Sequence, residues 1–270
     1  MYGKETRLRI GREASWGVPP AEGWNGIAPS GGKAGLSSRV NTRRFDVGVA
    51  PGVAYAVADF EAAATQANLT ALAEAALERD ADGGMPSYTV QVCDAAGARE
   101  VRGALARRLR IKSGIARAEL TIWLEFIGKV FGAASPFAAS ACGKPFTFHS
   151  AEIQINSAAA PCKEFSISVN NNIFIGPSDD DNDASFLTAG RQEMTGYVIL
   201  ADDRRDLVDG DVHSLEVTFG GSPHGARILA PEVFFTWVRE IRSAAEGALQ
   251  VLYFETASGG VSSGLSISLV

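Results

Sequence analysis

The sequence contains few of the side chains that most enzymes use for chemistry. It has three histidines and three cysteines in 270 residues, and none lies at a spacing that is typical of a metal site. Motifs of nucleotide-binding loops, zinc proteases and serine hydrolases are also missing. The sequence therefore predicts no catalytic, cofactor-binding or metal-binding residues and no enzyme activity. The three histidines are His149, His213 and His224, and the three cysteines are Cys93, Cys142 and Cys162.

Long apolar runs and an excess of basic residues are also lacking. No run approaches the ~20 apolar residues that cross a bilayer, and Met1–Arg12 is charged, unlike a secretory signal peptide. An odd number of cysteines without a pairing pattern is typical of reduced thiols in a protein made in a cytoplasm. The net charge is −6 and the isoelectric point is near 5.2, so the basic footprint of a nucleic-acid-binding protein is missing.

Alternation of apolar and polar residues is what the sequence has most of, and it is clearest between Pro145 and Ile175. A period of two indicates strands with one buried face, and Asn170–Asn172 end the run with residues that tolerate turns. With 46% hydrophobic residues and 29 glycines, the chain is predicted to be mainly β. The alternating apolar residues are Phe146, Phe148, Ile153, Ile155, Phe165, Ile167 and Val169.

Residues 1–44 are predicted to form an N-terminal arm. They are polar, rich in glycine and punctuated by proline, and only Leu8 and Ile10 alternate cleanly, which indicates one short strand. Trp16 and Trp24 favour docking of this segment on another surface. Two interpretations stay open: the arm docks on a neighbouring molecule, or it packs as an irregular terminus on its own domain.

The rest of the chain is predicted to form two β domains. The first covers residues 45–132 and holds the one strong helical pattern, at residues 65–79, where Leu69, Leu72, Ala76 and Leu77 share a side. Small, loosely patterned residues at 133–144 predict a linker. The second domain covers residues 145–270 and includes an acidic loop at residues 176–191.

The two predicted domains resemble each other in pattern. Ser87–Phe126 and Ser214–Glu255 show the same order of alternating segments at a nearly constant spacing of about 128 residues, which is what a duplication leaves. Any two antiparallel β domains alternate alike, so chance similarity is the alternative.

Two charged runs have a structural and a functional interpretation. Arg107 and Arg108 are adjacent on a predicted strand and are expected to point to opposite faces, which favours ion pairs over a groove for nucleic acid. The carboxylates of Asp179–Asp183 are contiguous and cannot all face one calcium ion. This run is interpreted as a solvated loop, with contact to the arginines of an adjacent subunit as the alternative.

Four segments together carry a resemblance to a known family. They are GREASWGVPP at Gly11–Pro20, the alternating stretch Pro145–Ile173, GRQEMTGYV at Gly190–Val198 and LQVLYFETA at Leu249–Ala257. In combination the chain resembles the tail tube (major tail) proteins of long-tailed bacteriophages, in the larger form that holds two tube domains. The predicted helix at residues 65–79 is similar to the single helix that packs on the tube sandwich of that family.

The resemblance implies a fold, an assembly and a place. The fold would be two tandem tail-tube-like β-sandwich or barrel domains with a flanking α-helix and an internal duplication. Three copies would form a pseudo-hexameric ring, and stacked rings would form a tube in the virion tail, after assembly in the host cytoplasm. Partners would be other copies, other tail proteins (tape measure, terminator and distal tail) and genomic DNA in transient, non-specific passage, with no membrane. The polar segments Gly17–Asn41 and Ile175–Arg191 would then be arms that reach the next ring or subunit.

Two alternative functions stay open. A terminator, hub or neck protein of the same tails would have a related fold, but a terminator would stop at one ring. A carbohydrate-binding or hydrolytic β-sandwich would show clustered aromatics and paired carboxylates, whereas Trp123 and Trp237 lie inside separate predicted strands.

Overall fold

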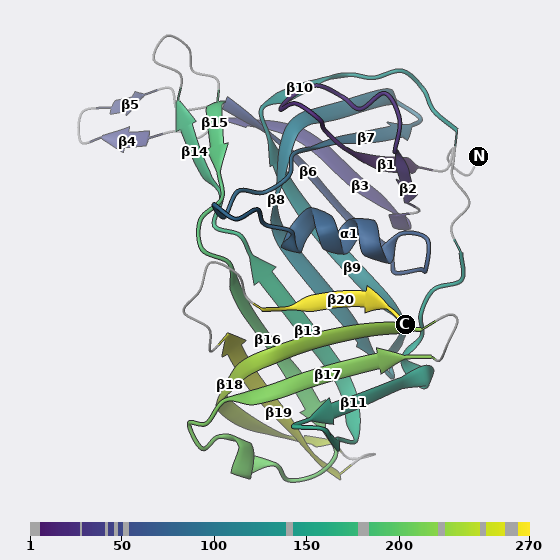
Figure 1. The fold of residues 1–270 in the computed structure, drawn as a ribbon, viewed down its shortest axis with the longest axis vertical. Coiled ribbons are helices and arrows are strands. Elements are labelled where there is room, and N and C mark those ends of the chain that lie inside the picture. Colours follow the sequence, from purple (N-terminus) through teal and green to yellow (C-terminus); the bar gives the residue numbers. More distant parts are fainter. Residues whose placement is uncertain are drawn as a thin grey trace.

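The computed structural model describes residues 6–27, 29–40, 43–45, 48–50, 54–138, 143–177, 184–220, 225–243, 247–256 and 264–270. In this part of the chain strands dominate, as the alternation predicts, and a single α-helix is present. The fold is mainly β, in agreement with the sequence (Figure 1).

The first half contains β1 to β10 and the helix α1. Their bounds are β1 Arg7–Arg12, β2 Asn25–Ile27, β3 Pro29–Val40, β4 Arg43–Phe45, β5 Gly48–Ala50, β6 Ala54–Ala63, α1 Leu69–Leu77, β7 Tyr88–Asp94, β8 Gly97–Gly114, β9 Arg117–Gly128 and β10 Val130–Ala133.

The second half contains β11 to β20 and two short 3₁₀ helices, η1 and η2. Their bounds are η1 Phe148–Ser150, β11 Ala151–Ile155, β12 Ala158–Ala159, β13 Cys162–Asn170, β14 Phe174–Pro177, β15 Ala184–Thr188, β16 Glu193–Leu200, η2 Arg205–Leu207, β17 His213–Phe219, β18 Ala226–Ser243, β19 Gly247–Thr256 and β20 Ser266–Leu269.

The second half repeats the strand pairing of the first, element by element. The order β2-β1-β7-β8 recurs as β12-β11-β17-β18, and β3-β6-β9-β8 recurs as β13-β16-β19-β18. The hairpin β4–β5 between β3 and β6 matches the hairpin β14–β15 between β13 and β16, and β10 on β8 matches β20 on β18. Chance similarity of two sheets does not produce this agreement, which supports the predicted internal duplication.

The β-bulges fall at matching places and fix which residues correspond. The β7–β8 ladder is irregular next to the Tyr88–Ala104 pair, and the β17–β18 ladder is irregular next to the His213–Val233 pair. The β8–β9 ladder is irregular after Ala106, opposite Phe126, and the β18–β19 ladder after Phe235, opposite Phe254.

The constant spacing expected from the sequence is wrong in detail. The sequence aligns Ser87 with Ser214, whereas the structure aligns Tyr88 with His213, because turns of different length connect the repeated strands.

One continuous sheet spans both halves. Its strand order is β3-β6-β9-β8-β13-β16-β19-β18, and the halves meet where the second part of β8 pairs with β13. The first parts of β8 and β18 leave this sheet and pair with β7 and β17, which forms a second layer over each half. Figure 1 shows the halves one above the other along the long axis, with α1 in front of the sheet.

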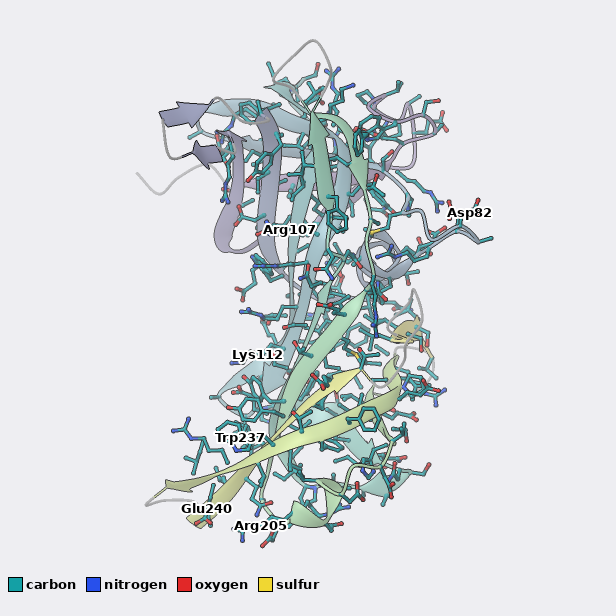
Figure 2. The ribbon with its side chains drawn as sticks, turned by 90° about the vertical axis from the view of Figure 1, so that its left-hand side faces the viewer. Asp82, Arg107, Lys112, Arg205, Trp237 and Glu240 are labelled. Carbon is teal, nitrogen blue, oxygen red and sulfur yellow. The ribbon has the colours of Figure 1, made fainter. Side chains whose placement is uncertain are left out.

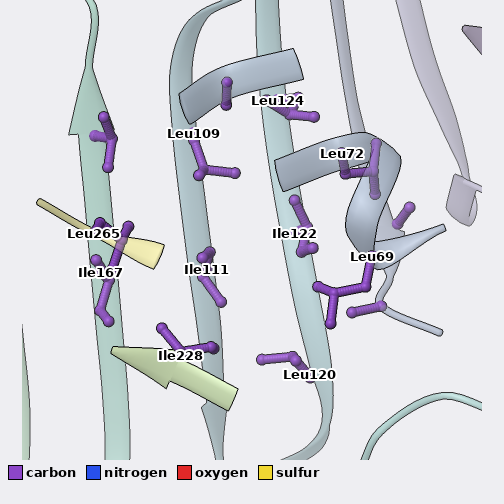
Figure 3. Packing of buried hydrophobic residues seen from close by; sticks show 14 of the residues in the cluster. Leu69, Leu72, Leu109, Ile111, Leu120, Ile122, Leu124, Ile167, Ile228 and Leu265 are labelled. Carbon is purple, nitrogen blue, oxygen red and sulfur yellow. The ribbon is translucent and has the colours of Figure 1, made fainter. Parts of the chain in front are cut away.

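The space between the layers is filled by one apolar core that reaches through both halves. Leu109 and Ile111 of β8 and Ile167 of β13 are buried in it. Helix α1 adds Leu69 and Leu72 and lies against β8, β9 and β20 (Figure 3). A helix of the first half therefore closes the core over a strand of the second.

The local signals that delimit the helix act as expected, with shorter bounds. The pattern predicts a helix at residues 65–79, but the helix of the structure is shorter, Leu69–Leu77. It begins later because Asn68 Oδ1 accepts a hydrogen bond from Thr65 N and holds a turn before the helix. After the helix, Asp80 accepts the N–H groups of Asp82 and Gly84, and Gly83 has a φ of +83°.

The N-terminal segment differs from the extended arm that its composition predicts. β1 pairs with β7, and β3 pairs with β6 across residues 34–40, so these strands lie in the two layers of the first half. Trp16 Nε1 donates to Gly103 O at 3.0 Å, and Arg9 lies 4.2 Å over the Trp24 ring. Both tryptophans contact their own chain, and the carboxylate of Glu13 accepts N–H groups of Gly17 and Gly103.

Two further expectations concern single segments. Within the alternating stretch Pro145–Ile175, which predicts strands, Phe148–Ser150 with His149 form η1 instead, because the backbone turns there before β11 begins. In the acidic loop predicted at residues 176–191, the described parts pair as β14 and β15. Asp179–Asp183 lie outside the described residues, as do Cys142 and His224.

Candidate functional site: the open sheet face and two sheet edges

The continuous sheet buries one face and leaves the other outside the core. We call the second the open face. It carries the residues that alternate with buried ones, such as Arg110 and Lys112 beside Leu109 and Ile111 on β8. Arg107, Lys112 and Trp237 lie along this side of the molecule (Figure 2).

Among the described residues of the open face, seven acidic side chains stand beside six basic ones, and two ion pairs join them. Arg107 bonds Glu125 at 3.2 Å, and Lys112 bonds Glu164 at 2.9 Å, while Tyr197 donates its hydroxyl to Glu164. The basic members are Arg39, Arg107, Arg108, Arg110, Lys112 and Arg239, and the acidic members are Asp59, Glu61, Glu119, Glu125, Glu164, Glu193 and Glu255.

The pairing changes the titration of the groups around Glu164. The hydrogen bond to Glu164 raises the pKa of Lys112, so its ammonium stays charged. Burial raises the pKa of Tyr197, and the hydrogen bond to Glu164 raises it further. These groups are only partly buried, and exposed ion pairs stabilise a fold by about 0–1 kcal/mol. The main effect of the ion pair is that the Glu164 carboxylate neutralises the charge of Lys112 locally.

Arg107 and Arg108 do not point to opposite faces, which corrects the expectation from a regular strand. The ladder slips between Ala106 and Arg108, so Arg108 stands opposite Glu125 while the side chain of Arg107 also reaches Glu125. A bulge places two consecutive residues against one partner residue. The two arginines therefore share the open face, and no pattern in the sequence marks the extra residue.

Aromatic rings continue the open face on the second half. Trp237 stacks on Tyr253 with ring centroids 5.2 Å apart, and Tyr253 contacts Tyr197 at 6.1 Å. Trp237 is 56% exposed. Arg110 lies 5.7 Å over the ring of Trp123 on the first half. Both tryptophans lie within strands, as the sequence predicts.

The two halves meet at an internal seam, the antiparallel pairing of β8 with β13. It runs from Arg108 opposite Asn170 to Gly114 opposite Glu164. A hollow of about 300 Å³ lies over it, lined by Arg108, Arg110, Trp123 and Glu193 among others. Because carboxylate and guanidinium groups share this hollow, it does not favour one sign of ligand.

The sheet ends at two strand edges. Among the described strands, β3 pairs with β6 alone, and Trp237–Arg239 of β18 pair with β19 alone. We call these the β3 edge and the β18 edge. Unpaired edges of a long sheet are sites of strand addition. In the repeat, β3 corresponds to β13 and β18 to β8, so the two edges are the counterparts of the two strands that form the internal seam.

In the described ranges, side chains suited to covalent or metal chemistry do not gather at one place. His213 is buried, lies beside Asp209 at 3.0 Å and Asn156 at 2.9 Å, and contacts Phe235, which holds the loop that precedes β17. Burial raises the pKa of the Cys162 thiol to about 12. Among the described residues, no group of three or more histidine, cysteine and acidic side chains could hold a metal ion.

Comparison with protein families gives a match over nearly the whole chain. The phage tail tube protein family matches residues 3–247, which include both repeats up to the start of β19. The chain belongs to the phage tail tube protein family. It is a structural component of a phage tail, as the resemblance implies.

Other comparisons add limits to this assignment. A comparison with curated proteins finds no relative that matches this tail tube protein. None of the helices in the described part of the chain has the length and apolar character that a membrane crossing requires. In a tail tube protein the sheet, its open face and its two edges are therefore the features to relate to function.

Proposed function

We propose that this tail tube protein assembles head to tail into closed rings of three copies, and that stacked rings form the conduit for the phage genome. The observation that supports this is the internal seam. Two equivalent four-strand sheets already join edge to edge within the chain, and the outer edges of the joined sheet are the counterparts of the edges used there. The same contact can be repeated between copies.

The number three comes from the resemblance to two-domain tail tube proteins, and the repeat is compatible with it. Each chain would supply two tube units, so a ring of three has six nearly equivalent units. A contact between two different edges is heterologous and closes only as a ring or continues as a helix. A ring also removes both exposed edges, which otherwise invite uncontrolled strand addition.

We place the open face on the inside of the ring. The apolar core, the second layer of strands and α1 cover the other face of the sheet. The open face is therefore the face of the sheet that is left to line a lumen. The described open face carries seven acidic side chains beside six basic ones, and the ion pairs Arg107–Glu125 and Lys112–Glu164 hold two of the basic groups, so the face has no excess of positive charge. Tight binding of DNA needs many lysines and arginines that release counterions, so this wall suits DNA that slides past.

We divide the chain into two tube units at β1–β10 and β11–β20, and not into an arm of residues 1–44 followed by a domain at 45–132 and a linker at 133–144. The pairing of β1 and β3 supports the earlier start. The hairpin β14–β15 is the better arm, since Phe174 and Phe186 on it are 64% and 51% exposed. Arms of this kind would contact neighbouring rings or the tape measure, terminator and distal tail proteins, and assembly would take place in the host cytoplasm.

Electron microscopy of the purified chain tests the proposal. We expect hollow tubes built of rings with threefold symmetry. Rings that never stack would indicate a terminator, and a monomer at high concentration would contradict the assembly.

A variant at the β18 edge tests the contact. Val238 corresponds to Leu109, whose backbone faces β13 across the internal seam. Val238→Pro removes an N–H that faces away from β19, and proline is tolerated on an edge strand. We expect a folded chain that forms no rings, whereas Val238→Thr keeps the N–H and the rings. Rings formed by Val238→Pro would show that copies join elsewhere.

A further inference from the structure

We infer that the β3 edge of a second copy pairs with the β18 edge in one register, with Arg239 opposite Ser37 of the partner subunit. This inference rests on the proposed ring, in which the second copy is the neighbour, and adds which residues meet. The internal seam serves as the template, because the two strands there are the repeat counterparts of the two edges.

The first step assigns β8 residues to β18. Ala106 and Phe235 precede the matching bulges, opposite Phe126 and Phe254. Counting along both strands from this point, Arg108 corresponds to Trp237 and Arg110 to Arg239.

The second step assigns β13 residues to β3. Phe254 pairs with Gly196, and Gly196 pairs with Ile167 of β13. Phe126, the counterpart of Phe254, pairs with Ala58, and Ala58 pairs with Leu36 of β3. Ile167 therefore corresponds to Leu36, and Ser168 to Ser37.

The template then fixes the register between copies. Within the chain Arg110 stands opposite Ser168 and Arg108 opposite Asn170. The corresponding pairs between copies are Arg239 with Ser37 of the partner subunit and Trp237 with Arg39 of the partner subunit.

Side-chain size gives independent support. At the internal seam the open face sets long side chains of β8 against short ones of β13: Arg110 faces Ser168, and Lys112 faces Ser166. The two edges repeat this contrast, because β18 presents Trp237, Arg239 and Ile241 while β3 presents Gly35 and Ser37.

Slipped registers are less favourable. A slip of two residues in one direction sets Arg239 against Arg39 of the partner subunit, and like charges directly opposite each other destabilise a strand pair. A slip of one residue exchanges the open and core faces of the added strand. The inferred register instead places an arginine beside Trp237, a favourable cation–π partner.

The backbone pattern of the seam shows where a disulfide would fit. Asn171 N donates to Arg107 O and Ile115 N donates to Lys163 O. Because hydrogen-bonded pairs alternate along an antiparallel ladder, Arg110 and Ser168 form a non-hydrogen-bonded pair, with Cα atoms about 4.5 Å apart. This separation lies within the range that a disulfide spans.

The experiment oxidises assembled double-cysteine variants and separates them on non-reducing gels. We expect Ser37→Cys with Arg239→Cys to give covalent dimers and trimers but no larger species, since a closed ring holds three copies. Arg110→Cys with Ser168→Cys is the internal control and should oxidise within a single chain. Arg39→Cys with Arg239→Cys is the slipped control and should cross-link at least tenfold less. Variants that carry only one of the two introduced cysteines measure any cross-link to the native Cys93, Cys142 and Cys162.

The outcomes separate the inference from the proposed function. Rings in the microscope without a Ser37–Arg239 cross-link, or with a stronger cross-link in the slipped control, would overturn the register and leave the ring intact. Cross-linked species larger than trimers would overturn the closed ring of three. A chain that stays monomeric and does not cross-link would overturn both.

Discussion

Asn171 connects the two repeats through buried hydrogen bonds, and its replacement is the sharpest test of how the halves are held together. Its side chain is fully buried and lies directly after β13. Nδ2 donates to Ala76 O at 2.9 Å and Ala106 O at 2.8 Å. Oδ1 accepts from Arg79 at 3.1 Å and Gln192 at 2.9 Å. One side chain thus joins the end of α1, β8 and the start of β16.

The expected cost follows from the groups left behind. In Asn171→Ala, Ala106 O and the Arg79 guanidinium lose this partner inside the protein, and each such loss costs about 1–3 kcal/mol. The free energy of unfolding should fall by about 3–5 kcal/mol when the small cavity is included. With a slope of about 3 kcal/mol per molar urea, the midpoint would shift by more than about 1 M.

Urea unfolding, monitored by circular dichroism at a protein concentration too low for assembly, measures this shift. Asn170→Ala is the matched control, since Asn170 is half-buried and its side-chain hydrogen bonds within the described part of the chain stay in its own turn, with Asn172. It should cost about 1 kcal/mol or less. Asn171→Asp keeps the size but turns the donor into an acceptor facing two carbonyl oxygens, so it should not restore stability. Equal midpoints for Asn171→Ala and Asn170→Ala would refute the role of these bonds.

Two further predictions concern the N-terminal segment and alkaline pH. The carboxylate of Glu13 accepts Thr89 Oγ1, Gly17 N and Gly103 N, so Glu13→Ala should expose the segment after β1 to proteases at least tenfold more than Glu22→Ala on the exposed surface; equal cleavage would contradict this. Burial raises the pKa of Cys162 from 9.0 and that of Tyr88 from 10.0, each to about 12. As the pH rises, the unfolded chain therefore loses these protons before the folded chain does. The free energy of unfolding is highest below pH 9 and falls from there toward pH 12, and each of the two groups lowers it by at most about 1.4 kcal/mol per pH unit. Urea midpoints between pH 8 and 11 measure the slope, which Cys162→Ala should reduce; an unchanged slope would mean that this thiol does not contribute.

The sequence predicts what depends on local pattern. Ile153, Ile155, Phe165, Ile167 and Val169 alternate in the sequence and are buried in the structure. The helix is found within its expected range because alanine and leucine favour it locally. Alternation and propensity act within a few residues, and a single sequence contains them in full.

The sequence does not predict what depends on distant partners. Pro29–Val40 has many glycines and serines, yet it forms a strand because β6 supplies its ladder. The bulge at Arg107 is invisible in the pattern, since arginine fits either face of an exposed strand. The internal seam joins residues far apart in the chain, so no local pattern predicts it. Its equivalence to the two outer edges is visible only once the pairing order of both repeats is known.

The helix gives the two kinds of seam in the proposed ring different strengths. Helix α1 lies against β8, which is one strand of the internal seam, and against β20 of the second half, with Leu69 and Leu72 in the shared core. Its counterpart in the second half is η2, a single turn with one buried residue, Leu207. The contact between copies would then depend mainly on strand pairing. In the proposed ring, chains would fold alone and join afterwards, because the contact that needs the apolar core lies within each chain and the contact that needs only a ladder lies between chains.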